Sequence, residues 1–168
     1  MATNILTQVR LKELLHYDPA TGVFTNAQKR GQRGVLGAVA GSPNGARGYI
    51  RIKINGAKYF AHRLAWLHEY GVLPATQIDH IDRNPTNNKL SNLRIATSSE
   101  NMQNTGLRCD NISGYKGVTR HTQENKWRAR ITINRKQYCL GLFDDAIAAN
   151  TAYLAAASKL HPNRPLAA

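Results

Sequence analysis

The stretch Gln77–Asn104, "QIDHIDRNPTNNKLSNLRIATSSENMQN", places an Asp-His pair and six asparagines together in a strongly basic chain. "QIDHID" predicts a strand that carries Asp79 and His80, and "LRIAT" predicts its antiparallel partner. "SSENMQN" predicts a short helix that begins near Ser98 or Ser99, with Ser98 as its N-cap. The sequence therefore predicts two strands and a helix folded around one small polar site.

These residue types suit phosphodiester hydrolysis, which needs a base for water and a divalent cation for the developing charge. Neighbouring strand residues point to opposite faces, so Asp79 and His80 can serve one centre only where strand and helix meet. There, the carboxylate of Asp79 and the amide oxygen of Asn101 could hold a hard cation such as Mg²⁺. His80 could accept a proton while an amide carbonyl, such as that of Asn92, holds its other N–H.

The charge of the chain predicts a polyanionic partner. Its 168 residues carry a net charge of +13, and basic residues are in excess in both halves. No apolar run approaches the roughly 18 residues of a membrane-spanning helix, and no signal-peptide core opens the chain, so we expect a soluble protein with no membrane partner. Cys109 and Cys139 are isolated, which predicts a reducing compartment, no disulfide framework and no zinc fold.

Residues 1–60 predict elements that accompany the module with the polar site. Leu11, Leu14 and Leu15 have helical spacing, and Asp18-Pro19 should stop that helix. Residues 29–48 predict a Gly-rich basic loop that either meets phosphate or is an ordinary solvated loop. Alternating apolar residues around an Asn55-Gly56 turn predict a hairpin over 50–59 that packs on the module with the polar site.

A helix should follow in "AHRLAWLHEYG", with Gly71 at its end. His62 and His68 are six residues apart on this helix, too far round it for joint metal binding. We therefore expect structural roles for both histidines. Asn84, Asn87 and Asn88 are expected to shape the loop between the two strands of the polar site.

The C-terminal third predicts a three-stranded antiparallel sheet on one helix, after a linker over 107–112. The strand candidates are "YKGVTRH", "KWRARITIN" and "KQYCLGLF", and the helix runs from about Asp145 to Leu160 with Asp144 as its cap. In the middle strand, apolar residues alternate with Arg128, Arg130, Thr132 and Asn134. The apolar face should meet the helix through Ala149, Tyr153 and Ala156, and the basic face is either simply solvated or enters the DNA major groove.

Asp79-His80, Asn92 in "SNLR" and Asn101 in "SSEN" resemble the HNH endonuclease family in its homing-type branch. The resemblance implies the ββα-metal fold and DNA cleavage with one divalent cation, Mg²⁺ or Mn²⁺. It further implies that Asp79 and Asn101 are the metal ligands, that His80 is the general base, and that Asn92 orients His80. Asn101 stands where the family's final histidine would, as in HNN variants, and Asn104 is a competing ligand candidate.

"SGYKGVTRH", "KWRARI" and "CLGLFDDAIAANTAYLAAASKLH" are similar to the DNA-binding domain of plant ethylene-response factors, the Apetala-two-like domain. In that family the exposed sheet face touches bases and phosphates. The nucleic-acid-binding candidates on this resemblance, with Arg128 added from the strand alternation, are Lys116, Thr119, His121, Arg128, Arg130, Thr132, Gln137 and Cys139. Family arginines and a tryptophan are absent at several of these positions, so a different target sequence is expected.

The sequence thus predicts an α+β protein, in which a ββα-metal nuclease module precedes a small three-stranded antiparallel sheet packed on one helix. The expected parts are 1–60, the nuclease module over 61–106, the linker over 107–112 and the DNA-binding domain over 113–163. The expected activity is nicking of double-stranded DNA in the cytoplasm, that of a bacterial host if the protein is phage-encoded. The alternatives are a non-catalytic DNA-binding phage regulator and a restriction- or packaging-associated nuclease. No pattern fixes the oligomeric state.

Overall fold

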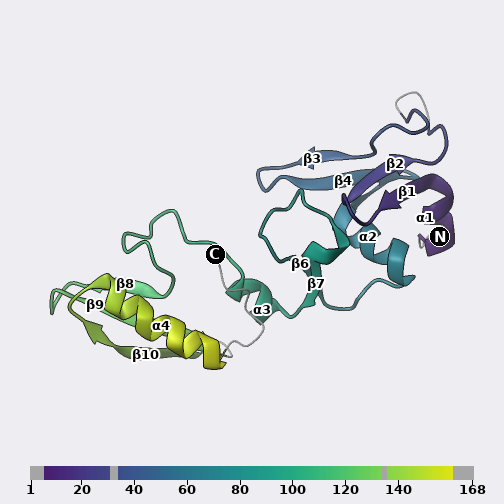
Figure 1. Ribbon diagram of the computed structural model, residues 1–168. Helices are drawn as coiled ribbons and strands as arrows, with labels where there is room; N and C mark the ends of the chain where they lie inside the picture. The colour runs from purple at the N-terminus through teal and green to yellow at the C-terminus, as the bar shows by residue number, and fades with distance from the viewer. Residues whose placement is uncertain (1–5, 31–33, 134–135, 161–168) are drawn as a thin grey trace. The chain divides into compact units, whose positions relative to one another are not determined.

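The computed structural model describes residues 6–30, 34–133 and 136–160. The chain forms two compact units, Met1–Ala96 and Thr97–Ala168 (Figure 1). Both units combine helices with small antiparallel sheets, so the expected α+β class is confirmed. The division falls before the helix that the sequence assigns to the 61–106 module, and the domain bounds given above stay predictions.

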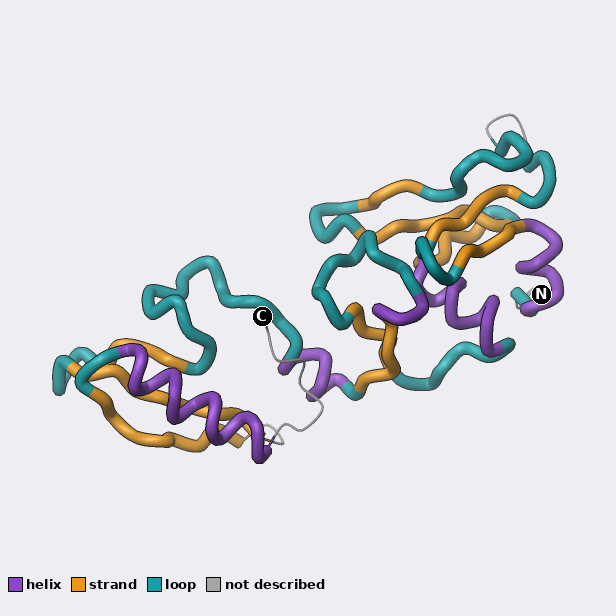
Figure 2. The backbone as a smooth tube through the Cα atoms, in the orientation of Figure 1, coloured by secondary structure: helices purple, strands orange, loops and turns teal. Residues whose placement is uncertain are grey.

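The first unit contains three small sheets and two α-helices. β1 pairs with β2, β3-β4-β5 form a three-stranded sheet, and β6 pairs with β7 (Figure 2). In chain order the elements are α1 (Gln8–Leu14), β1 (Leu15–Asp18), β2 (Val23–Asn26), β3 (Ser42–Asn44), β4 (Tyr49–Ile54), β5 (Ala57–Phe60), α2 (Ala61–Tyr70), β6 (Gln77–His80), the 3₁₀ turn η1 (Leu90–Asn92) and β7 (Leu93–Ala96).

The N-terminal segment differs from the expectation. The predicted helix ends at Leu14, and Leu15 is already extended, with φ −139° and ψ 135°. Leu15 and Tyr17 are buried while His16 is exposed, so a period of two replaces the helical period at this point. The carboxylate of Asp18 then accepts hydrogen bonds from Ala20 N–H and the Thr21 hydroxyl, which forms the turn of the β1–β2 hairpin. The sequence interpretation missed this hairpin, and it also missed β3 within the expected loop.

The other predicted elements of this unit are confirmed. Asn55 and Gly56 have φ values of 48° and 85°, as a tight hairpin turn requires, and they join β4 to β5. Gly71 ends α2 in the left-handed conformation with φ 76°. One hydrophobic core joins the helices to all three sheets and includes Leu11, Leu15, Phe24, Ile52, Ile54, Leu64, Ala65, Ile78 and Leu93.

The second unit begins with α3 (Ser98–Gln103) and continues with β8 (Val118–His121), β9 (Lys126–Ile133), β10 (Lys136–Phe143) and α4 (Ala146–Leu160). The three strands form an antiparallel sheet in the order β10-β9-β8, and α4 lies along one face of it (Figure 1). The predicted strands and helix are therefore confirmed. Asn134 and residues 161–163 of the predicted domain lie outside the described residues.

Both predicted helix caps in this unit are wrong by one residue. Thr97, not Ser98, caps α3: its hydroxyl accepts from Glu100 N–H, and Thr97 N–H donates to the Glu100 carboxylate. At α4, Asp145 accepts from Ala148 N–H at 2.7 Å, whereas Asp144 pairs with Lys126. In each case the capping oxygen must reach a backbone N–H three residues ahead, which fixes the cap at the residue just before the helix.

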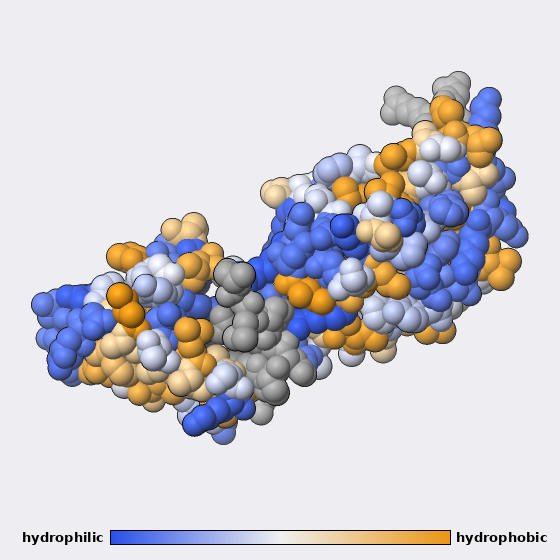
Figure 3. Space-filling model, in the orientation of Figure 1, coloured by the Kyte–Doolittle hydropathy of each residue, from blue (hydrophilic) through white to orange (hydrophobic). Residues whose placement is uncertain are grey.

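The apolar face of the C-terminal sheet meets α4 as expected. Ala149 and Tyr153 are buried, Ala157 joins them, and Ala156 is partly buried. Gly117 is required here, because a Cβ at this position would lie 2.4 Å from the Tyr153 ring and 2.5 Å from the Arg130 carbonyl. Apolar side chains are also visible over the outer side of α4 (Figure 3).

Candidate active site

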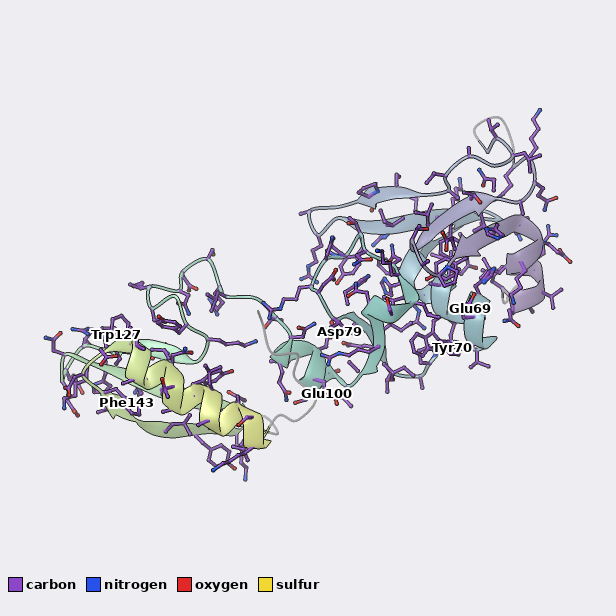
Figure 4. All side chains as sticks on the ribbon, in the orientation of Figure 1. Glu69, Tyr70, Asp79, Glu100, Trp127 and Phe143 are labelled. Atoms are coloured by element: carbon purple, nitrogen blue, oxygen red, sulfur yellow. The ribbon has the colours of Figure 1, made fainter. Side chains whose placement is uncertain are left out.

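The predicted polar site is built on the β6–β7 hairpin. Asp79 lies opposite Arg94 and His80 lies opposite Leu93 in the antiparallel register. Asp79 and His80 are both buried, with 7% and 5% of their surface exposed, and Asp79 is labelled on β6 in Figure 4. Isolated buried charges are costly, so the contacts of these two side chains determine what the site can do.

Asp79 forms an ion pair with Arg94. Nε and Nη2 of Arg94 donate to the same carboxylate oxygen, Oδ2, at 3.1 and 2.9 Å. Because both residues are largely shielded from water, this pair fixes the orientation of the Asp79 carboxylate. An ionised carboxylate in a fixed position is the form that a divalent cation requires.

The ring of His80 contacts the side chains of Asn88, His62 and Tyr49. Its Nε2 lies 3.2 Å from Oδ1 of Asn88. The ring centroids of His62 and Tyr49 lie 5.1 and 5.9 Å away. When Asn88 Oδ1 accepts a proton from Nε2, the neutral ring carries its basic lone pair on Nδ1. That tautomer suits a base that takes a proton from water.

Asn92 was expected to orient His80, but its recorded hydrogen bonds go elsewhere. Its Nδ2 donates to Asp82 Oδ1 and to the Asn87 carbonyl, each at 2.8 Å, and its Oδ1 accepts from Asp82 N–H at 3.0 Å. Asn92 therefore closes the loop between β6 and β7, and the side chain on His80 is that of Asn88. An orienting role for Asn92 stays a prediction.

The asparagine-rich loop is shaped as expected. Asn84 Oδ1 accepts from Thr86 N–H, and Asn87 Nδ2 donates to Asp82 Oδ2 at 2.6 Å. Burial acts to raise the pKa of Asp82, but hydrogen bonds from Asn84, Asn87 and Asn92 lower that pKa on balance. Asp82 thus stays ionised and anchors the loop. Asn88 has a second function that the sequence interpretation did not assign, its contact with His80.

The β1–β2 hairpin supports the same loop from outside. The buried Tyr17 hydroxyl donates to the Asn88 carbonyl at 2.7 Å, and Leu90 N–H donates to the Pro19 carbonyl at 3.2 Å. A Cβ on Gly22 would lie 2.4 Å from backbone atoms of Asn88, so the hairpin turn touches the loop directly. The first 60 residues therefore help to position the neighbour of His80. The β1–β2 hairpin was not predicted from the sequence, so this contact could not be predicted either.

His62 was expected to have a structural role, and its ring also lies against that of His80. Its ring stacks on Phe60 and lies against Tyr49. Burial, followed by the nearby His80 and Arg63, lowers the pKa of His62 to about 3. His62 is therefore neutral near pH 7 and adds no positive charge beside His80. His68 packs on Tyr17 and Phe24 instead, as its structural assignment requires.

Asn101, the other expected metal ligand, lies on α3 in the second unit, and Asn104, its competitor, is the C-cap of the same helix. Among the described residues, no cluster of three or more His, Cys, Asp or Glu side chains is arranged to hold a metal ion. The two expected ligands, Asp79 and Asn101, would instead supply one carboxylate and one amide oxygen. Both are hard oxygen ligands and leave most of a cation's shell to water and phosphate, so they fit Mg²⁺ or Mn²⁺.

The expected nucleic-acid-binding residues of the sheet share one face. Thr119 lies opposite Arg128, Thr132 opposite Gln137, and Arg130 opposite Cys139. Arg130 donates from Nη1 to Gln137 at 2.9 Å and from Nη2 to Thr119 at 3.3 Å, so its guanidinium is fixed across all three strands. His121 follows Thr119 on the same side of β8.

Three buried polar atoms on this face have no hydrogen-bond partner among the described residues: Nδ1 of His121, Nε of Arg128 and Nε of Arg130. Buried polar atoms normally have a hydrogen-bond partner, so three atoms without one on a single face are unusual. Lys116 differs from the other candidates, because its ammonium group donates to backbone carbonyls of the protein itself.

Comparison with known proteins gives a family match over the segment that contains β6, β7 and α3. Residues 59–103 match the sequence model of a family described as HNH endonuclease. The matched segment carries Asp79, His80, Asn92 and Asn101.

A phage protein is similar over part of the chain. Protein 3.8 of Escherichia phage T7 is 38% identical over 78 residues, which are 46% of this chain and 64% of that protein. The chain therefore spans somewhat less than two thirds of that relative. A solved structure titled "DNA binding and cleavage by the HNH homing endonuclease I-HmuI" is 19% identical with a TM-score of 0.42, over 87% of this chain and 76% of that one.

None of the described helices is long and apolar enough to cross a membrane.

Proposed function

We propose that this protein is a metal-dependent endonuclease of the homing type that nicks double-stranded DNA. The observation that carries the proposal is the arrangement of the β6–β7 hairpin: an Asp79 carboxylate oriented by Arg94 next to a buried His80 whose ring contacts Asn88, within the segment that matches HNH endonucleases. Hydrolysis of a phosphodiester needs these two groups, a base and a cation-binding carboxylate.

In this proposal His80 accepts the proton of the attacking water at Nδ1, while Nε2 keeps its proton toward Asn88. Asp79 and Asn101 hold one divalent cation, Mg²⁺ or Mn²⁺, with Asn101 assigned on the sequence resemblance alone. When bound, the cation supplies charge stabilisation at the phosphate. Asn92 and Asp82 hold the loop that carries Asn88, so that His80 keeps its tautomer and orientation.

We assign site selection to the polar face of the C-terminal sheet. Phosphate contacts position a protein on DNA but carry little sequence information, so groove contacts must select the site. Arg130, fixed between Thr119 and Gln137, has the planar donor geometry that reads guanine in the major groove. The unsatisfied donors of His121 and Arg128 support the same assignment, as does the resemblance to the ethylene-response-factor domain.

One observation favours a second candidate, a DNA-binding regulator without catalysis. The carboxylate of Asp79 is already neutralised by Arg94, which a purely structural ion pair would also explain. A restriction- or packaging-associated nuclease would share the proposed chemistry and differ only in biological role.

The test is a plasmid-nicking assay with wild-type protein, H80A and the control H16A, whose histidine is exposed on β1. Supercoiled plasmid is incubated with Mg²⁺, Mn²⁺ or chelator. We expect relaxed circles that require both metal and His80, with H16A equal to wild type. If the protein bound DNA but did not nick it with either metal, the assignment as a regulator would replace the assignment as a nuclease. Early linear product would instead indicate paired active sites.

Two further variants separate the roles of the asparagines. If Asn88 orients His80, N88A lowers the nicking rate by about 10- to 100-fold, the range typical of groups that orient a functional histidine. N92A should act by loosening the loop, so its loss of rate should be accompanied by a lower melting temperature.

A further inference from the structure

Lys116 makes an unexpected set of contacts with the end of α3. Its Nζ lies 2.7 Å from the Gln103 carbonyl and 2.8 Å from the Thr105 carbonyl, with the Thr105 hydroxyl at 3.3 Å and the Met102 carbonyl at 3.5 Å. An ammonium group has three N–H donors. The side chain thus turns its donors toward the protein's own backbone, although its position in the sequence resemblance is that of a DNA contact.

Two of these carbonyls, those of Met102 and Gln103, belong to the last turn of α3, and the Met102 carbonyl also accepts from the Thr105 hydroxyl. The last four C=O groups of an α-helix have no partner within the helix, and a cation there also interacts favourably with the helix dipole. α3 has no basic residue of its own in its last turn. Lys116, thirteen residues after Gln103 in the sequence, supplies that cation from the start of the C-terminal domain.

α3 is a short helix on the surface. The helix has only six residues, and none of them is buried. Helices this short are unstable on their own. A cavity of about 760 Å³ lies between α3 and the sheet, lined by residues of both, so the two elements do not pack closely against each other. The Thr97–Glu100 capping box stabilises one end of the helix, and Lys116 contacts the other.

We propose that Lys116 is a positioning residue that fixes α3, and with it Asn101, to the DNA-reading sheet domain. The catalytic part of the proposal rests on the proposed function, in which Asn101 is a metal ligand. The contact joins the helix that carries this ligand to the domain that selects the site, and Lys116 is not available to phosphate while it makes this contact.

The test compares K116A, K116R and K159A with wild-type protein. Lys159 is exposed in the last turn of α4, so K159A removes one charge from the same unit without touching α3. Amide hydrogen exchange of the peptide over 98–105, without DNA or metal, reports on the helix alone. We expect exchange there to rise on the order of tenfold in K116A, as the loss of a charge-assisted hydrogen bond predicts, and to stay near wild type in K116R and K159A.

Nicking and binding then separate positioning from DNA contact. Positioning predicts that K116A lowers kcat by about tenfold at saturating DNA with Kd within about twofold, and that K116R recovers most of the rate. A phosphate contact predicts unchanged hydrogen exchange, weaker binding and a salt slope reduced by about one, and that result would overturn the proposal. If wild-type protein does not nick DNA, the proposed function fails, while the exchange experiment still decides whether Lys116 fixes α3.

Discussion

The β6–β7 hairpin and the polar face of the C-terminal sheet are both candidate sites, but they are stabilised in opposite ways. Around the hairpin, Asp79, His80, Asn88 and Asn92 are buried and hydrogen-bonded within the protein. On the sheet, the arginines are only partly buried and some of their donors have no protein partner.

This difference has a physical consequence. A buried polar network is costly to disrupt, because each group that loses its partner remains shielded from water. Changes near the hairpin should therefore affect folding and catalysis together. Changes on the sheet face should affect DNA binding and leave stability nearly constant, since its arginine side chains do not hold the core together.

The largest expected effect is from G22A. Gly22 has φ +75°, and a Cβ there would lie 2.4 Å from the backbone of Asn88 and Lys89. Left-handed backbone costs alanine about 1–2 kcal/mol, and the overlap with backbone adds about 1–3 kcal/mol. We expect a loss of about 3 kcal/mol in the free energy of unfolding, measured by urea denaturation, together with reduced nicking.

G45A is the matched control for that change. Gly45 has nearly the same φ, +73°, but no atom within 4 Å of the added Cβ. G45A should lower the free energy of unfolding only by the cost of left-handed backbone for alanine, about 1–2 kcal/mol, and leave nicking unchanged. Equal losses in the two variants would show that the hairpin turn does not support the loop at Asn88.

The second prediction concerns acid sensitivity through His62. Its pKa is lowered from 6.5 to about 3 in the folded protein, so between these values the unfolded chain binds a proton that the folded chain does not. Stability should therefore fall as the pH drops from about 6.5 toward 3, by roughly 1.4 kcal/mol per pH unit for this one proton. Urea unfolding from pH 7 to pH 4.5 measures the slope.

H62F tests whether this slope belongs to His62, because phenylalanine keeps the stacking on Phe60 and cannot titrate. Its stability should be nearly flat from pH 6.5 to 4.5. Asp18 and Asp82 in this unit have lowered pKa values. Their contribution to the stability of the protein is lost only as the pH falls to about 3.8 and below, so they do not dominate the window from pH 6.5 to 4.5. An unchanged slope in H62F would assign the acid sensitivity to other groups.

The smallest effect on folding is expected from R130A, a change on the polar face of the C-terminal sheet. Losing a good bidentate base contact costs about 1–3 kcal/mol of discrimination, whereas the melting temperature should stay within about 1 °C because the side chain is not part of the core. Competition binding on randomised duplexes would reveal relaxed preference at one position. A uniform loss of affinity across all sequences would instead assign Arg130 to phosphate contact.

Local patterns in the sequence determined much of this protein. Asn55-Gly56, the alternation in β9, and the strands around Asp79 and Leu93 were predictable because their conformations depend on neighbouring residues and on a period of two. It was equally predictable that Asp79 and His80 are neighbours on one short strand. Caps were missed by a single residue, since several hydroxyl or carboxyl groups stand together at each helix start.

Only the tertiary structure decided which side chains meet across the fold. Asn88 rather than Asn92 lies against His80, because the loop folds back on itself through Asp82 and is held there by Tyr17 of a distant hairpin. Lys116 contacts the end of α3, whereas Arg130 donates to Gln137 and Thr119 across the sheet. Such contacts depend on the reach of a side chain between elements far apart in sequence, and no local period or motif spacing encodes that distance.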